Sequence, residues 1–197
     1  MRQLTVEDLL TLNRIPEIEE LSLQVIALFF EQYLMNRQFY FSVKHKMDEV
    51  RIRFESGSLC HLLGIHHFVG GRTGRGDLGH RKILQEEITF ASLQKINLGQ
   101  FNKDRMRMLA FPLIYQVLTN ENSFFQEIDS RFDTVRCHLM IHDQYGINYV
   151  ELKLRRFDSD FPTFYAPVTV HVERMLPAKK KIAIKTIQQL PLDEGWN

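Results

Sequence analysis

The sequence has few cysteines, no long apolar run and almost no net charge. Its two cysteines, Cys60 and Cys137, are too few for a disulfide framework of the kind that stabilises small secreted domains. The longest uninterrupted apolar run, from Val25 to Phe30, is far shorter than the roughly 20 residues that cross a bilayer as a helix. With 25 Lys and Arg against 24 Asp and Glu, the chain also lacks the basic excess of many nucleic-acid-binding domains.

The composition that remains is that of a folded domain. Of the 197 residues 44% are hydrophobic, while six prolines and ten glycines exclude a collagen-like or low-complexity chain. The length suggests one domain with an appended helical segment, and we place the boundary between residues 1–36 and 37–197. No signal-peptide pattern opens the sequence, so we expect a cytoplasmic protein without a membrane partner.

Charge is distributed unevenly along the chain. Residues 1–36 carry two arginines and six acidic residues, whereas residues 37–82 carry nine Lys and Arg against four acidic residues. A basic segment that also contains histidines attracts phosphate and favours nucleic-acid binding. A solvated surface of mixed charge is the alternative interpretation.

The N-terminal segment has helical periodicity. Thr5 and Asp8 form a capping signal before a short helix through Leu12, and Pro16 suits the first turn of a longer one. Apolar residues then recur at three- and four-residue spacing, namely Ile18, Leu21, Val25, Leu28, Phe29 and Tyr33. We expect this stripe to pack on the domain, and binding of a partner protein through the acidic helix is the alternative.

The middle of the chain mixes strand and helix signals. Residues 38–43 and 50–54 have strand character, 59–65 fit a short helix, and five glycines between Gly70 and Gly79 predict a mobile loop. Helical patterning returns over 81–119, with Thr89 and Asn102 as candidate caps. Pro112 is expected to kink or split that last helix.

From about Asp133 the apolar residues alternate with the two-residue period of strands. The alternating runs cover 135–142, 149–155 and 164–172, and residues 181–187 are a candidate last strand. Short turns between consecutive strands predict an antiparallel sheet, because parallel neighbours need a longer crossover. Helices first and strands last indicate an α+β fold.

The polar positions of these strands suggest a chemically active surface. The two-residue period predicts three groups, which are Arg136, His138 and His142; Tyr149, Glu151, Lys153 and Arg155; and Tyr165, Thr169, His171 and Glu173. If the groups share one face, they supply bases, acids and cations for phosphoryl transfer without a metal. The ordinary wet face of an antiparallel sheet is the competing interpretation.

Three histidines, His61, His66 and His67, cluster around the short helix. Their spacings of five and six do not match the i,i+4 spacing of a helical zinc pair, so zinc is a minor alternative. Cys60 and His61 are adjacent on a helix and point about 100° apart, which argues against a thiol–imidazole dyad.

The run from Gly74 to Gly79 fits G-x-G-x-x-G, but no strand directly precedes it and no βαβ unit follows. We interpret it as part of a flexible loop. In that loop Arg72 and Arg75 are candidates to hold phosphate.

Three segments together resemble a known family. They are residues 50–54 (Val-Arg-Ile-Arg-Phe), 61–67 (His-Leu-Leu-Gly-Ile-His-His) and 164–169 (Phe-Tyr-Ala-Pro-Val-Thr). In this order and context they resemble the phage-associated branch of the BECR nucleases, which include barnase, EndoU, colicin-type and RelE-like ribonucleases. The resemblance covers roughly residues 38–175. It implies N-terminal helices followed by a curved antiparallel sheet, with RNA on the sheet and metal-independent cleavage.

The resemblance also assigns residues. His61 is similar to the family's helix histidine, Thr169 to its late-strand hydroxyl that holds phosphate, and His67 stands where the family has a basic residue. Tyr165, Lys153 and Glu151 join the catalytic candidates from the strand-face argument alone. Arg51, Arg53, Arg72 and Arg75 are the RNA-binding candidates.

We therefore expect a metal-independent endoribonuclease that acts as a toxin or conflict effector, with no cofactor. Its expected partners are RNA and an inhibitor or antitoxin protein. A non-catalytic RNA-binding or protein-interaction module on the same scaffold is the alternative, and an adaptor protein that uses the acidic helix is a third hypothesis.

Overall fold

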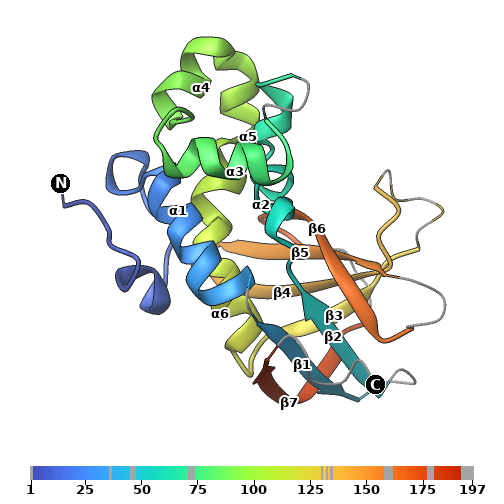
Figure 1. The fold of residues 1–197 in the computed structure, drawn as a ribbon. Helices are drawn as coiled ribbons and strands as arrows, with labels where there is room; N and C mark the ends of the chain where they lie inside the picture. The colour runs from blue at the N-terminus through green and yellow to red at the C-terminus, as the bar shows by residue number, and fades with distance from the viewer. Residues whose placement is uncertain are drawn as a thin grey trace.

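The structure, a computed structural model, describes residues 2–35, 37–44, 48–70, 74–129, 131, 133, 135–157, 162–176 and 180–191. Helices gather on one side of the molecule and strands on the other (Figure 1). No described helix combines the length and apolar character that a membrane crossing needs.

All the helical elements of this described part precede strand β3. They are η1 (Asp8–Thr11), η2 (Ile18–Glu20), α1 (Leu23–Phe29), the π-helical turn η3 (Phe30–Met35), η4 (Ser56–Ser58), α2 (Leu59–Leu62), η5 (Ile65–His67), α3 (Gly76–Leu84), α4 (Phe90–Ile96), α5 (Leu98–Ala110), η6 (Phe111–Leu113) and α6 (Ile114–Thr119). The strands are β1 (Gln38–Val43), β2 (Glu49–Arg53), β3 (Phe124–Glu127), β4 (Leu139–Tyr145), β5 (Asn148–Arg156), β6 (Phe164–Glu173) and β7 (Ile182–Leu190). The predicted α+β class is confirmed.

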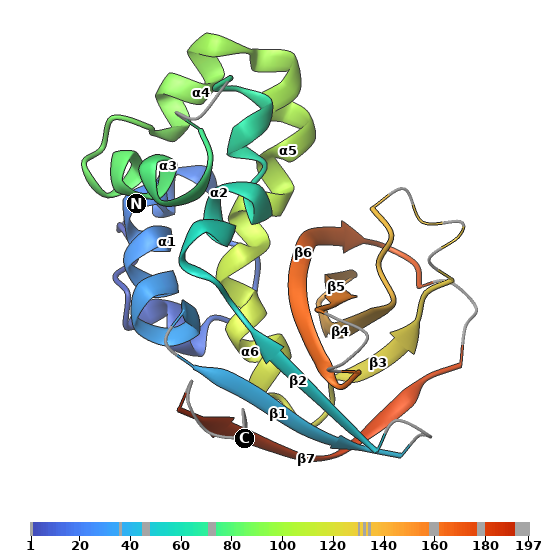
Figure 2. The same cartoon turned by 45° about the vertical axis from the view of Figure 1, so that its right-hand side comes forward.

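The strands close into a barrel in the order β1-β2-β6-β5-β4-β3-β7 (Figure 2). β4, β5 and β6 are antiparallel neighbours in chain order, as the alternation predicts. The expected curved antiparallel sheet is instead a closed barrel, because β7 pairs with both β1 and β3 and so leaves no free edge. One pairing is parallel, with Arg51 opposite Phe164 and Ile52 opposite Tyr165 between β2 and β6.

The long N-terminal helix begins later than Pro16. Leu21 is extended, and the Ser22 hydroxyl accepts a hydrogen bond from the Val25 amide, so α1 starts at Leu23. Ahead of it, Glu17 and Glu20 form a capping box around the single turn η2. Local side-chain capping therefore overrides the apolar stripe in setting the start of the helix.

The helices that precede β3 begin and end partly where the sequence predicts. Thr89 caps α4 with a reciprocal Ser92 bond, and Pro112 separates α5 from α6 through the turn η6. The cap of α5 is Asn97 rather than Asn102, because the Asn97 side chain accepts from the Gln100 amide at 3.0 Å.

Two predicted features are replaced by other structure. Residues 135–138 alternate like a strand but are not part of β4, which starts at Leu139. The backbone there is held in another conformation, because Asp133 accepts a hydrogen bond from the Cys137 amide at 2.8 Å and Arg136 takes φ +53°. Part of the predicted glycine-rich loop is helix α3, in which Gly79 packs on α2. A Cβ at Gly79 would lie 2.7 Å from the Cys60 sulfur, so only glycine allows this approach.

Helices and barrel share one apolar core. Leu9 and Phe29 from the N-terminal segment lie in the same buried cluster as Phe41, Phe125 and Leu152 from the strands. The division into residues 1–36 and 37–197 stays a prediction. One face of strands β4 to β6 packs in this core, and the opposite face carries the polar side chains described next.

Candidate active site

Three histidines meet at a chain reversal where the helices join the barrel. α2 ends at Leu62, Gly64 takes φ +75°, and the chain enters η5 at Ile65. The reversal stacks the His61 and His66 rings with centroids 4.6 Å apart and brings those of His66 and His67 to 4.1 Å. Because α2 contacts β6, this histidine turn (residues 61–67) lies beside the barrel.

A polar stripe on α5 supports the histidine turn. Gln100, Asp104 and Arg107 follow the spacing that places residues on one face of a helix. His67 Nδ1 lies 2.7 Å from Asp104 Oδ2, and the Gln100 amide donates to the same oxygen at 2.7 Å. A carboxylate only accepts, so His67 donates its Nδ1 hydrogen and keeps Nε2 for other contacts.

Arg107 joins the histidine turn to the barrel. Its Nη2 donates to Thr169 Oγ1 at 2.9 Å, and its Nε donates to the Val170 carbonyl at 3.3 Å. On the other side, Arg107 Nη1 would lie 2.8 Å from a Cβ at Gly64, so the guanidinium rests against the turn. Arg107 therefore holds a positive charge between the histidines and the Thr169 hydroxyl.

A β-bulge decides which β6 side chains face this charge. Thr169 pairs with Lys153 and Pro167 pairs with Leu154, which leaves Val168 as an extra residue on β6. The extra residue turns Thr169 to the polar face, while Tyr165 lies in the apolar cluster on the other face. The expected common face of Tyr165 and Thr169 is therefore wrong.

The polar face beyond Thr169 carries further titratable groups. His171 Nε2 lies 3.5 Å from Thr169 Oγ1, and Lys153 Nζ donates to Asp133 Oδ1 at 3.2 Å. Burial would raise the pKa of Asp133, but hydrogen bonds from Cys137 and Lys153 hold it below its usual value. Lys153 is thus a cation that an ionised carboxylate fixes in place.

Several histidines of the site are held neutral. Partial burial lowers the pKa of His61, and the positive charge of Arg107 lowers it further. Burial and the neighbouring His67 and His61 lower the pKa of His66 to about 4. Burial together with Lys153 and Arg107 also lowers the pKa of His171. An imidazole that is neutral at pH 7 can accept a proton.

Glu151 is buried on the same face of the strands. It lies between His142 on β4 and His171 on β6 in the strand register, with Glu151 Oε1 3.1 Å from His142 Nδ1. The His142 ring in turn stacks on Phe124. The charge of Glu151 also acts on His171. It raises the pKa of that ring, but burial, Lys153 and Arg107 lower it by more.

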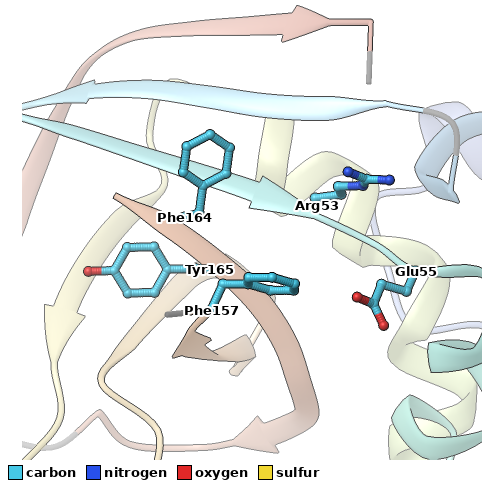
Figure 3. A pocket seen from close by; sticks show the side chains of 5 residues that line it. All are labelled: Arg53, Glu55, Phe157, Phe164 and Tyr165. Atoms are coloured by element: carbon cyan, nitrogen blue, oxygen red, sulfur yellow. The ribbon is translucent and has the colours of Figure 1, made fainter. Parts of the chain in front are cut away.

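Tyr165 lines a separate pocket with Arg53, Glu55, Phe157 and Phe164. Figure 3 shows the three aromatic rings gathered on one side and Arg53 and Glu55 on the other. The Tyr165 hydroxyl points away from both polar side chains (Figure 3). The structure thus places Tyr165 apart from the Arg107–Thr169 contact.

Arg51 and Arg75 lie at different places in the structure. The Arg51 guanidinium lies 5.3 Å from the ring centroids of both Tyr40 and Phe164. Arg75 is exposed at the start of α3, close enough to His61 to lower its pKa slightly. Arg72 lies outside the described residues.

The histidine turn does not form a recognisable metal site within the described part of the chain. No three His, Cys, Asp or Glu side chains there are arranged to hold a metal ion. The two cysteines are buried and free, and burial raises the pKa of Cys60 to about 12, which argues against a thiolate at neutral pH.

The mixed helix-and-strand architecture agrees with the α+β class that the sequence predicts. The family profile described as phage-Barnase-EndoU-ColicinE5/D-RelE like nuclease4 matches residues 22–190. The chain belongs to this nuclease family, and the match extends the resemblance to α1 and β7. Searches of curated proteins and of solved structures found no match.

Sequence reasoning missed the residues that connect the site. Asp104 and Arg107 were part of a predicted helix and Gln100 lay in the helical pattern just before it, but none of the three was assigned a role. Their i, i+4, i+7 spacing is the signal that would have identified them. His171 was assigned only to a polar strand face, and its approach to Thr169 depends on the bulge.

Proposed function

We propose that the protein is a metal-independent endoribonuclease that cleaves RNA by attack of the substrate's own 2′-hydroxyl. The observation that carries the proposal is the Arg107 guanidinium, which contacts Thr169 Oγ1 at 2.9 Å beside the neutral imidazole of His61. A fixed cation and a hydroxyl at one point suit a phosphate, and a neighbouring neutral base suits a proton transfer.

The first half of the proposed reaction forms a bond to phosphorus. His61 takes the proton of the 2′-hydroxyl, whose oxygen attacks the adjacent phosphorus. Arg107, the Thr169 hydroxyl and Lys153 offset the negative charge that develops on the phosphoryl oxygens. Since the nucleophile belongs to the substrate, the protein supplies proton transfer and charge alone.

The second half breaks the bond to the 5′-oxygen. That oxygen leaves as an alcohol after taking a proton, which we assign to His67. For this step His67 carries a proton on each ring nitrogen: Asp104 accepts the Nδ1 hydrogen, and the Nε2 hydrogen passes to the leaving oxygen. The products are a 2′,3′-cyclic phosphate and a 5′-hydroxyl. Glu151, opposite His171 in the strand register, balances charge near that ring.

The cellular setting extends the proposal. Membership in a phage-associated nuclease family supports a role in conflict between genetic elements. Such a role calls for an inhibitor or antitoxin protein that keeps the nuclease silent in the cell that makes it.

The proposal is tested with purified protein and matched RNA and DNA strands. We expect the RNA alone to be cut, equally well with and without EDTA, leaving cyclic phosphate ends. His61→Ala should reduce the rate by roughly 10²–10⁴-fold if His61 transfers a proton. Loss of cleavage in EDTA would favour a metal mechanism, and a folded protein that binds RNA without cutting it would favour the binding-module alternative.

A further inference from the structure

The pocket formed by Arg53, Glu55, Phe157, Phe164 and Tyr165 has no part in the cleavage steps above. Its cavity of about 210 Å³ is smaller than the roughly 300–1,000 Å³ of pockets for drug-sized ligands. Aromatic rings form one side and a cation and a carboxylate the other (Figure 3). A flat aromatic group with polar edges, of the size of one nucleobase, fits this lining.

Two segments of the chain connect the pocket to the candidate active site. β2 and β6 run parallel at the pocket, where Ile52 pairs with Tyr165. Beyond it, one segment continues through Glu55 to His61 and the other continues to Thr169. Tyr165 and Thr169 are four positions apart on β6, which corresponds to a rise of at most roughly 13 Å at about 3.3 Å per residue. A short extended stretch of RNA can bridge that distance.

We propose that this pocket holds an unstacked base of the RNA substrate, adjacent to the phosphate that Arg107 and Thr169 hold, and that Glu55 favours bases with an exocyclic amino group. The inference rests on the proposed function. Proteins that bind single-stranded nucleic acids commonly stack bases on aromatic side chains. Phe157 offers such a ring at the pocket, because 53% of its surface is exposed.

Glu55 gives the pocket its selectivity. An ionised carboxylate only accepts hydrogen bonds, so it pairs with the amino hydrogens of adenine, cytosine or guanine. Uracil presents one imide hydrogen between two carbonyl oxygens, which repel a carboxylate that approaches it. Arg53 supplies donors for ring nitrogens and carbonyl oxygens on the same base or for the neighbouring phosphate.

The test measures binding rather than cleavage. Fluorescein-labelled oligoadenylate, oligocytidylate and oligouridylate with 2′-O-methyl riboses lack the attacking hydroxyl, so their affinities for the full chain are read by anisotropy. We expect the adenine and cytosine strands to bind more tightly than the uracil strand. Phe157→Ala should weaken their binding by roughly 5- to 150-fold, the usual worth of one stacked base. Ile147→Ala, at an apolar residue outside the pocket that is even more exposed than Phe157, is the matched control and should leave binding unchanged.

Glu55→Gln should remove most of the preference against uracil, because an amide both donates and accepts. Unchanged affinity in Phe157→Ala, or an unchanged preference in Glu55→Gln, would overturn the proposal, as would failure of wild type to bind any strand. Wild-type protein that binds with the expected preference yet never cuts RNA would refute the nuclease proposal and leave the base pocket standing.

Discussion

Replacing Arg107 by glutamine tests the connection between the histidine turn and β6. The change keeps a polar side chain but removes the positive charge. It also removes the hydrogen bonds that the guanidinium donates to Thr169 Oγ1 at 2.9 Å and to the Val170 carbonyl at 3.3 Å. If Arg107 stabilises charge on the phosphoryl oxygens, its loss corresponds to removal of one oxyanion donor. Such removals lower kcat by roughly 10²–10³-fold.

A second readout of the same variant separates chemistry from folding. Burial and then the charge of Arg107 lower the pKa of His61, so Arg107→Gln should raise that pKa, as measured by NMR titration of the His61 ring. The acid limb of the cleavage profile should move to higher pH in parallel. A purely structural role for Arg107 would change the amount of folded protein without this shift.

Arg105→Gln is the matched control, because Arg105 is an exposed arginine on the same helix. It removes the same charge from the protein while leaving the Thr169 contact intact. Cleavage by Arg107→Gln at the wild-type rate, in a folded protein, would refute the role assigned to Arg107. Equal losses in the two variants would instead indicate a general effect of net charge.

Four further outcomes follow from the geometry. Gly64→Ala should lower the free energy of unfolding by about 1–2 kcal/mol, because Gly64 has φ +75° and a left-handed conformation disfavours a side chain; an unchanged urea midpoint would contradict this. Asp104→Ala should lower it by about 1–3 kcal/mol, since His67 and Gln100 lose their common acceptor, and thermal unfolding measures the change. His66 has a pKa of about 4 in the folded protein and 6.5 as a free side chain, so it binds a proton more readily in the unfolded chain. The free energy of unfolding should therefore fall as the pH drops from 6.5 to 4. His66→Gln should make this dependence on pH less steep, and an equally steep dependence would argue against a neutral His66 ring in the folded protein. Arg75→Gln should reduce the slope of log affinity for single-stranded RNA against log salt by roughly 0.7 if Arg75 contacts phosphate, whereas an unaltered slope would place Arg75 outside the RNA path.

Local sequence signals predicted the elements that are set locally. The two-residue period identified β4, β5 and β6 and their antiparallel order, and Pro112 marked the break between α5 and α6. The barrel closure was not predictable in this way. It depends on pairing β1 with β7 and β2 with β6 across more than a hundred residues, and no local pattern specifies such a register.

The site likewise combines features that local sequence predicts with features that depend on the tertiary fold. The histidine turn was recognisable as a cluster in the sequence, and the family match supports the segment that contains it. The faces of β6 were not predictable, because the extra residue at Val168 reverses the alternation between Tyr165 and Thr169. Arg107 belongs to a helix whose direction relative to β6 only the tertiary fold defines.

The most direct test of the central claim uses one RNA strand cut by the wild-type protein at a mapped position. A single 2′-deoxy substitution on the 5′ side of the scissile phosphate removes the proposed nucleophile and leaves every other contact in place. We predict that cleavage stops at that position while binding of the strand is retained. Continued cleavage there would contradict attack by the 2′-hydroxyl and with it the mechanism assigned to His61, Arg107 and Thr169.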